Sequence, residues 1–267
     1  MPDEVAAARS DEVEVVRDGH VIVVTINRPE RMNALNQAAH DTLRETWVSL
    51  HEDRSVRAIV ITGAGDRAFC TGMDLQDHAA RGGPRPSKPN VHDELRQTPL
   101  RCGVWLPTIV AVNGVCVGGG FHFVADADVV VAGSSAAFID THVTVGQVTA
   151  LEPIQLLPRI GLGNALKLAV LGRKGRISAD EALRISLVDE VVEPDELLPR
   201  AIELAQIAAA GSPAAIEASK RAIWAALDRP YREAMQHGWE LLLAHREHPD
   251  SIEGPKAFAE KREPKWQ

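Results

Sequence analysis

Two histidines, His122 and His142, are the residues of this chain whose type and placing are best suited to chemistry. His122 follows the run Gly118-Gly119-Gly120 by two positions, and His142 closes the segment F-I-D-T-H. Imidazole titrates near neutral pH, so the pair could transfer protons or activate water. Two histidines alone make a weak metal site, so no metal ion is expected. Each histidine taken alone could equally be a structural residue.

The glycine triplet lies between an apolar strand and a segment of helical character. Glycines at that place leave backbone N–H groups at a helix N-terminus, with no side chain to block the approach of a bound group. Such a position favours an anion or a developing oxyanion. The alternative is that the three glycines only allow close packing.

Five segments in order resemble the crotonase (enoyl-CoA hydratase/isomerase) superfamily. They are N-R-P-E-R-M-N-A-L (27–35), A-F-C-T-G-M-D-L (68–75), I-V-A-V-N-G-V-C-V-G-G-G-F-H (109–122), R-I-S-A-D-E-A-L-R-I-S-L-V-D-E-V-V (176–192) and A-F-A-E-K-R-E-P-K-W (257–266). The resemblance covers nearly the whole chain. It implies an α/β crotonase fold, in which repeated ββα turns form two roughly perpendicular sheets and a C-terminal helical region mediates a trimer or a dimer of trimers.

The resemblance also implies a site for an acyl-CoA thioester. One backbone N–H from each of two segments would stabilise the thioester enolate, and the matching positions are Met73 and Gly119. Coenzyme A would be part of the substrate, and no separate cofactor is expected. The positions matched to CoA contacts are Glu30, Arg31, Met32, Ala34, Ala68, Thr71, Asp74, Leu75 and Lys261. Lys261 could act across a subunit boundary or could simply be a solvated basic helix end.

The departures from the family pattern concern its acid and base. Hydratases of the family carry a glutamate at each of two positions that hold His122 and His142 here. The glycine-rich turn that follows reads T-A-L-E-P-I-Q-L-L (149–157) and introduces Glu152. Glu152 could orient His142 or act as the missing carboxylate; alternatively, it only favours the start of a helix.

The function expected from these residues is the processing of an acyl-CoA through an enolate held by backbone N–H groups. One alternative is a hydrolase or retro-Claisen C–C lyase of a β-dicarbonyl substrate, in which a histidine activates water. Another is an acyl-CoA-binding protein that has lost catalysis. The two retained titratable residues disfavour that last alternative.

Alternating β and α segments must position these groups. Two β-branched runs, 13–16 and 21–26, flank Asp18-Gly19 and predict a hairpin. A helix is expected over 37–51, and apolar strands over 58–62, 109–112 and 129–132. The Gly- and Pro-rich stretch 78–90, which holds Arg81, Arg85 and Lys88, predicts a loop. The helices expected in the last third of the chain span 196–210, 213–227, 231–245 and about 251–261.

These patterns divide the chain into a flexible N-terminus (1–12), a ββα core (13–197) and a C-terminal helical region (198–267). A formal net charge of -8 argues against nucleic-acid binding. Three cysteines without C-x-x-C spacing indicate a reducing compartment, and we expect a cytoplasmic protein. No membrane partner is expected, because no stretch provides eighteen uncharged apolar residues.

Overall fold

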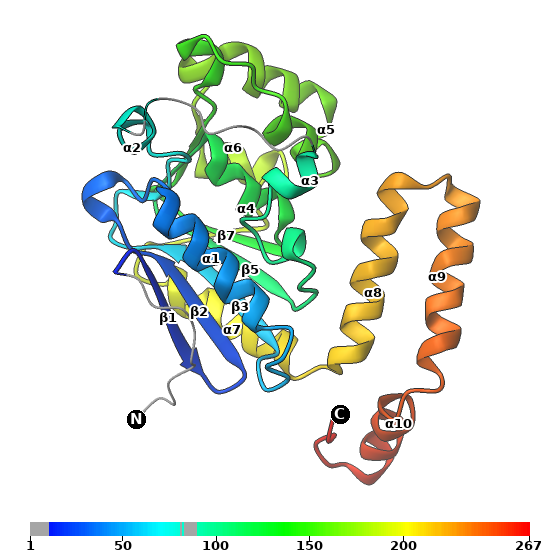
Figure 1. Cartoon of the computed structure of the whole chain (residues 1–267). Helices are drawn as coiled ribbons and strands as arrows, with labels where there is room; N and C mark the ends of the chain where they lie inside the picture. Colours follow the sequence, from blue (N-terminus) through cyan, green and yellow to red (C-terminus); the bar gives the residue numbers. More distant parts are fainter. Residues whose placement is uncertain (1–10, 81, 83–89) are drawn as a thin grey trace.

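The computed structural model describes residues 11–80, 82 and 90–267 of the chain. A six-stranded sheet runs through its centre in the order β1-β2-β3-β5-β7-β10 (Figure 1). Its strands are β1 (Val13–Asp18), β2 (Val21–Ile26), β3 (Ala58–Gly63), β5 (Thr108–Val112), β7 (Val129–Gly133) and β10 (Glu190–Val192). The predicted hairpin is confirmed: β1 and β2 pair antiparallel, and Gly19 turns between them with φ +59°.

Both faces of this sheet are covered, as its continuous apolar strands predict. Alternate residues of β2 point to opposite sides. Ile22 and Val24 pack with α1 (Gln37–Ser49), whereas Val21 and Val23 pack with α7 (Leu197–Ala209). Because α7 lies on the sheet, it is part of the core, although the division expected from the sequence placed residues 198 onward outside it.

A smaller sheet of four short strands positions the residues of interest. Its order is β4-β6-β8-β9, with β4 (Ala68–Cys70), β6 (Val115–Val117), β8 (Ala137–Ile139) and β9 (Ile177–Ser178). The first three strands run parallel, so their carboxyl ends meet at one edge. Met73, the glycine triplet and His142 each follow one of these ends.

The remaining helices surround this edge or follow it in the chain. They are α2 (Leu75–Ala80), α3 (Val91–Glu94), α4 (Phe121–Asp126), α5 (Leu151–Leu171), α6 (Ala179–Arg184), α8 (Pro213–Ala225), α9 (Tyr231–His245) and α10 (Asp250–Glu260). The expected loop over 78–90 is wrong at its start, because α2 continues to Ala80. Arg81, Arg85 and Lys88 lie outside the described residues.

Helix α5 and the turn after it, Leu151–Lys174, are long and apolar enough to cross a membrane by length and composition. The helix is nevertheless interrupted at Gly161, whose φ of +70° is not helical. Its first half contacts α4, and it carries buried Glu152 in its first turn. Leu156, Ile160, Ala165 and Leu168 of α5 pack into the core, and 22% of the apolar stretch is buried.

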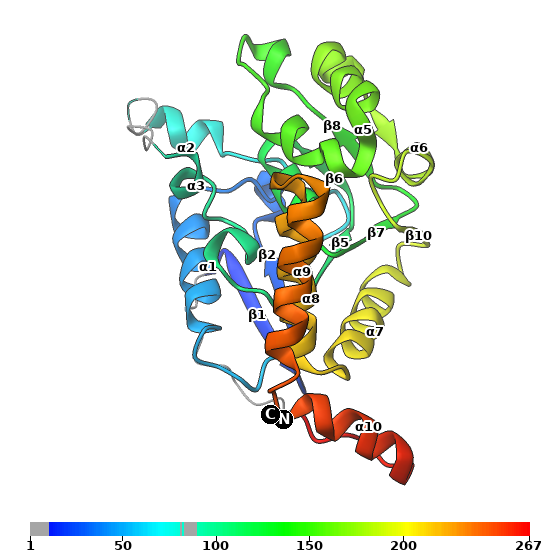
Figure 2. The same cartoon turned by 90° about the vertical axis from the view of Figure 1, so that its right-hand side faces the viewer.

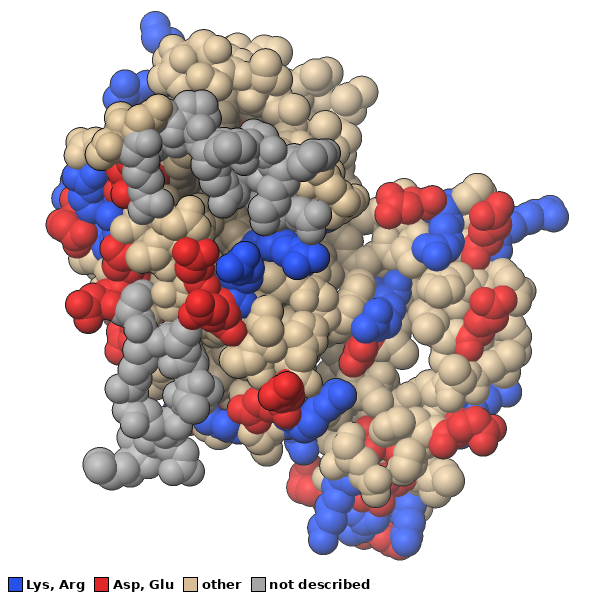
Figure 3. All heavy atoms as spheres, in the orientation of Figure 1, with Lys and Arg blue, Asp and Glu red and all other residues tan. Residues whose placement is uncertain are grey.

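Helices α8 and α9 form a hairpin that stands away from the core, and α10 lies at its open end, beside the start of α8 (Figures 1 and 2). We call these three helices the arm. Lys220 of α8 joins the arm to the core, since its Nζ lies 2.6 Å from both Asp128 Oδ2 and the Leu106 carbonyl oxygen. Figure 3 shows acidic and basic side chains interspersed along the arm, with uncharged surface between them.

Candidate active site

Two backbone segments meet where the oxyanion hole is expected. A Cβ added to Gly72 would lie 2.7 Å from the Gly119 nitrogen, and Gly72 has a φ of +77°, so only glycine suits this contact. Leu35 donates to the Gly72 oxygen and accepts from Asp74 N, a pattern that turns the Met73 N–H away from Leu35. The Gly119 N–H lies in the first turn of the 3₁₀ helix Gly118–Gly120, where such groups have no acceptor within the helix.

Asp74 holds the Met73 segment in place. Its carboxylate accepts from Arg28 Nη1 at 3.0 Å and from Arg31 Nη2 at 3.1 Å, and it also accepts from backbone N–H groups at the start of α2. Burial opposes the charge of this carboxylate, but the hydrogen bonds from Arg31, the helix and Arg28 outweigh it and lower the pKa of Asp74 to about 2. The side chain is 4% exposed and clamps the loop, so only the backbone of Asp74 is left to serve the expected CoA contact.

The other expected CoA positions fall into two groups. Ala34 and Ala68 are buried, and Thr71 donates its hydroxyl to the Met32 carbonyl oxygen at 3.1 Å, so this stretch offers mainly backbone to a ligand. Glu30 and Leu75 are exposed beside it. Lys261 ends α10, which lies at the opposite end of the molecule from α2 in Figures 1 and 2, so it does not join the group within one chain.

His142 is held by a buried aspartate that the sequence reasoning missed. Asp140 is fully buried at the end of β8, and its Oδ1 lies 3.0 Å from His142 Nδ1 and 2.9 Å from His142 N. Thr149 donates its hydroxyl to the other carboxylate oxygen at 2.6 Å. Burial opposes the charge of Asp140, but these hydrogen bonds lower its pKa. The Asp140 hydrogen bond, helped by the charge of Glu152, raises the pKa of His142 above 6.5 despite desolvation.

Glu152 lies between the two histidines. One carboxylate oxygen, Oε1, is 3.4 Å from His122 Nε2 and 3.8 Å from His142 Nε2. Burial alone would raise the pKa of Glu152, but the hydrogen bond from His122 and the other interactions of the carboxylate outweigh it and lower the pKa. The structure therefore brings His122, His142 and Glu152 together, and Glu152 does more than start a helix.

The partner of the remaining ring nitrogen was also missed. His122 Nδ1 contacts the amide oxygen of Gln155, which lies one helical turn after Glu152 on α5. The spacing of Glu152 and Gln155 was a usable signal, since residues three apart share a helix face.

Asp140, His142 and Glu152 could offer oxygen and nitrogen atoms within 4.8 Å of one another to a metal ion. Both oxygens of Asp140 already accept hydrogen bonds from His142 and Thr149, and His142 Nδ1 is used in the same bond. Only His142 Nε2 and the Glu152 carboxylate remain directed at each other. This donor set is that of a hydrogen-bonded acid–base group.

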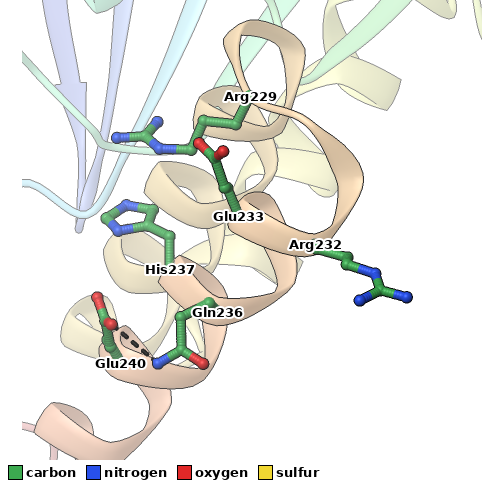
Figure 4. A pocket seen from close by; sticks show the side chains of 6 residues that line it. All are labelled: Arg229, Arg232, Glu233, Gln236, His237 and Glu240. Carbon is green, nitrogen blue, oxygen red and sulfur yellow. Dashed lines mark hydrogen bonds between the residues drawn. The ribbon is translucent and has the colours of Figure 1, made fainter.

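A separate cavity of about 430 Å³ lies on the arm (Figure 4). Its lining residues are Arg229, Arg232, Glu233, Gln236, His237 and Glu240. All belong to α9 or the turn before it, and Gln236 Nε2 donates to Glu240 Oε1 at 2.9 Å. The cavity shares no residue with the histidine site, whose arrangement of a carboxylate, two imidazoles and backbone N–H groups is the one suited to catalysis.

Comparison with known proteins shows to which family the chain is similar. Residues 17–267 match the family described as enoyl-CoA hydratase/isomerase. The chain is 36% identical over 249 residues to (E)-benzylidenesuccinyl-CoA hydratase of Thauera aromatica, covering 92% of this chain and 94% of that protein. It is 33% identical to carnitinyl-CoA dehydratase of Escherichia coli K12, covering 96% and 98%.

Solved structures give the same result. An enoyl-CoA hydratase/isomerase from Mycobacterium paratuberculosis superposes with a TM-score of 0.88 at 34% identity, covering 96% of this chain and 98% of that one. The α/β fold with two sheets is thereby confirmed, as is the expectation of an enzyme that processes acyl-CoA. The chain belongs to the enoyl-CoA hydratase/isomerase, or crotonase, family.

Proposed function

We propose that this enzyme adds water to the α,β double bond of an enoyl-CoA thioester, or removes it in the reverse direction, with His142 as the general base. The observation that carries the proposal is the hydrogen bond from His142 Nδ1 to buried Asp140. A carboxylate only accepts, so Nδ1 holds the ring proton and the lone pair of the neutral ring lies on Nε2. That nitrogen faces Glu152, and the His142 side chain is 29% exposed.

The residues can then divide the reaction as follows. His142 Nε2 takes one proton from water while the water oxygen bonds to Cβ. Glu152 accepts a hydrogen bond from the other O–H, which stays on the oxygen, and so orients the water. The electron pair of the double bond moves toward the thioester oxygen, where the Met73 and Gly119 N–H groups hold the enolate. The His142 imidazolium then returns its proton to Cα, so that one water has been added.

The names of the relatives support this reaction class, because a hydratase and a dehydratase act on CoA thioesters in opposite directions. The geometry supports the same mechanism in a chain without the two usual glutamates, since Glu152 supplies a carboxylate from a different segment. We propose that acyl-CoA binds along residues 30–34 and 68–75, mainly through contacts with their backbone.

We also propose that three copies, or two sets of three, form the working assembly. The arm buries none of its α8 or α9 residues. Several of its large apolar side chains are exposed, namely Ile223, Leu227, Met235, Trp239, Leu242, Ile252 and Phe258. Apolar surface of this kind on a projecting element is typical of subunit contacts. Lys261 would reach the CoA phosphates only across such a boundary.

The test is a rate comparison on three substrates: crotonyl-CoA, a 3-hydroxyacyl-CoA and a β-ketoacyl-CoA. His142→Ala should lower turnover of one of the first two on the order of a hundredfold or more. His20→Ala, in the remote β1–β2 hairpin, serves as the matched control and should leave it unchanged. If the enzyme cleaves the β-ketoacyl-CoA and turns over neither of the other two substrates, it is a hydrolase or C–C lyase and not a hydratase. Binding of every thioester with no turnover would indicate a non-catalytic protein.

A further inference from the structure

Of the two polar groups of the Gln155 amide, one has a hydrogen-bond partner and the other has none among the described residues. Its Oε1 contacts His122 Nδ1, while its Nε2 is buried and has no hydrogen-bond partner among the described residues. A buried N–H without an acceptor is unfavourable, and it is rarer in proteins than a carbonyl oxygen without a donor. The two ends of a carboxamide have nearly the same shape, so a half-turn about its last bond exchanges them without moving other atoms.

The half-turn changes which nitrogen of His122 holds the proton. With Nε2 of Gln155 toward the ring, the amide donates to Nδ1, and the proton of the neutral imidazole must lie on its Nε2. That N–H then points at Glu152 Oε1, 3.4 Å away, where a carboxylate accepts it. With the carbonyl toward the ring, a neutral His122 would instead present a lone pair to the same carboxylate oxygen, which is repulsive.

The surroundings of His122 favour the first arrangement. The ring is 6% exposed, so water does not supply an alternative donor freely. The charged group that faces it from α5 is Glu152, beyond which lies His142. On its own helix, Asp126 is engaged with Arg101 and Thr98. Gln155 is therefore the neighbour that decides the tautomer.

We propose that Gln155 is a positioning residue that holds His122 in the Nε2–H tautomer as a fixed donor to Glu152. Asp140 holds His142 in the opposite tautomer, with Nδ1–H. The two histidines thus have different tasks: His142 exchanges protons with the substrate, and His122 fixes the carboxylate between them. The task of His142 rests on the proposed function, whereas the tautomer of His122 does not.

The direct test is ¹⁵N nuclear magnetic resonance of the imidazole rings in the full-length protein without substrate. The signals of His122 are assigned by their loss in His122→Gln. We expect a pyrrole-type Nε2 and a pyridine-type Nδ1 in the wild type. In Gln155→Glu, a carboxylate can only accept from Nδ1, so both ring nitrogens should carry a proton, each donated to a carboxylate. A wild-type His122 with its proton on Nδ1 would overturn the proposal.

Activity gives a second readout. Gln155→Leu should lower kcat by about tenfold to a hundredfold with little change in KM, the range typical of losing a partner that orients a working side chain. Gln206→Leu, at an exposed position of α7, is the matched control and should change neither. An unchanged His122 spectrum in Gln155→Leu would also contradict the tautomer role. If the spectra agree with the proposed tautomer of His122 but His142→Ala keeps full activity, the proposed function is wrong while the role of Gln155 still holds.

Discussion

Asp140 is buried directly behind His142, with its Oδ1 3.0 Å from His142 Nδ1. Because the carboxylate can only accept, this contact determines which nitrogen of His142 can act as a base. The sequence left two catalytic roles open for Glu152, orienting His142 or acting as the missing carboxylate. In the structure, Asp140 holds His142 Nδ1, and Glu152 lies 3.8 Å from the opposite nitrogen.

Asp140→Asn should therefore impair catalysis while keeping the shape of the site. An asparagine amide can donate to Nδ1 and so stabilise the wrong tautomer, and it removes the charge that raises the pKa of His142. We expect a loss in kcat of at least about a hundredfold, since a comparable change in a hydrogen-bonded Asp–His pair costs more than that.

The pH profile of the same variant tests the cause. Hydration needs the neutral form of His142, so the wild-type rate should rise with pH through a midpoint above 6.5. In Asp140→Asn the residual rate should rise at a lower pH. Thr149→Val keeps Asp140 but removes the donor to its other oxygen, so its effect should be smaller. Equal midpoints in wild type and Asp140→Asn would argue against His142 as the titrating base.

The same groups should make stability depend on pH in a defined window. The pKa of His142 is raised by folding, so its contribution is complete below about pH 6.5 and is lost as the pH rises through the folded pKa. The pKa values of Asp140 and Glu152 are lowered, so their contributions are complete above about pH 4.5 and are lost as the pH falls.

The difference in free energy of unfolding between wild type and His142→Gln should consequently be largest between about pH 4.5 and 6.5. Urea titrations at a series of pH values would measure it. His20→Gln provides the control for a histidine on the surface. A difference that grows steadily toward pH 9 has the wrong sign for this arrangement and would refute it.

The sequence predicted the elements that depend on local pattern and left out contacts that depend on tertiary placement. Gly19 was sufficient to predict the hairpin, because the first residue of the two-residue turn Gly19–His20 needs a positive φ. The meeting of Met73 and Gly119 was inferred from family motifs. The pairing of Asp140 with His142 depends on how the chain turns after β8, which no periodicity encodes. Helix α7 was assigned to the C-terminal region because composition does not show that its alanine face covers the sheet.

Gly119→Pro should remove one of the two N–H groups proposed to hold the enolate. The expected loss of transition-state stabilisation is about 3 kcal/mol, or two to three orders of magnitude in kcat. A Cβ at this position would lie 3.3 Å from Gly72 Cα, so part of any loss could be steric. Gly119→Ala adds the Cβ and keeps the N–H, and it separates the two causes. Equal losses in the two variants would mean that the N–H is not used.

Light scattering should give a mass of three or six chains at micromolar concentration. Phe258→Glu, which places a charge on a side chain that is 88% exposed in the single chain, should weaken the assembly if α10 lies between subunits. Asp195→Lys, in the turn before α7, changes charge away from the arm and serves as the control. A monomer would contradict both the assembly and a role for Lys261 at a neighbouring site.

Asp74→Asn should show what the clamp on the Met73 segment is worth. Asparagine can still cap the start of α2, so the substitution mainly removes the charge held by Arg28 and Arg31. A lowering of the Asp74 pKa from 3.8 to about 2 corresponds to about 2 kcal/mol of stability at pH 7. Since the pKa is lowered, this contribution is present above about pH 4 and is lost as the pH falls toward 2.

Urea unfolding of wild type and Asp74→Asn at pH 7 and at pH 3 would measure this contribution. The difference in free energy of unfolding between the two proteins should be smaller at pH 3. Because the clamp also fixes the Met73 N–H that we propose as an oxyanion donor, kcat should fall more than KM changes. If stability falls while kcat is unchanged, Asp74 supports the fold without positioning the Met73 N–H.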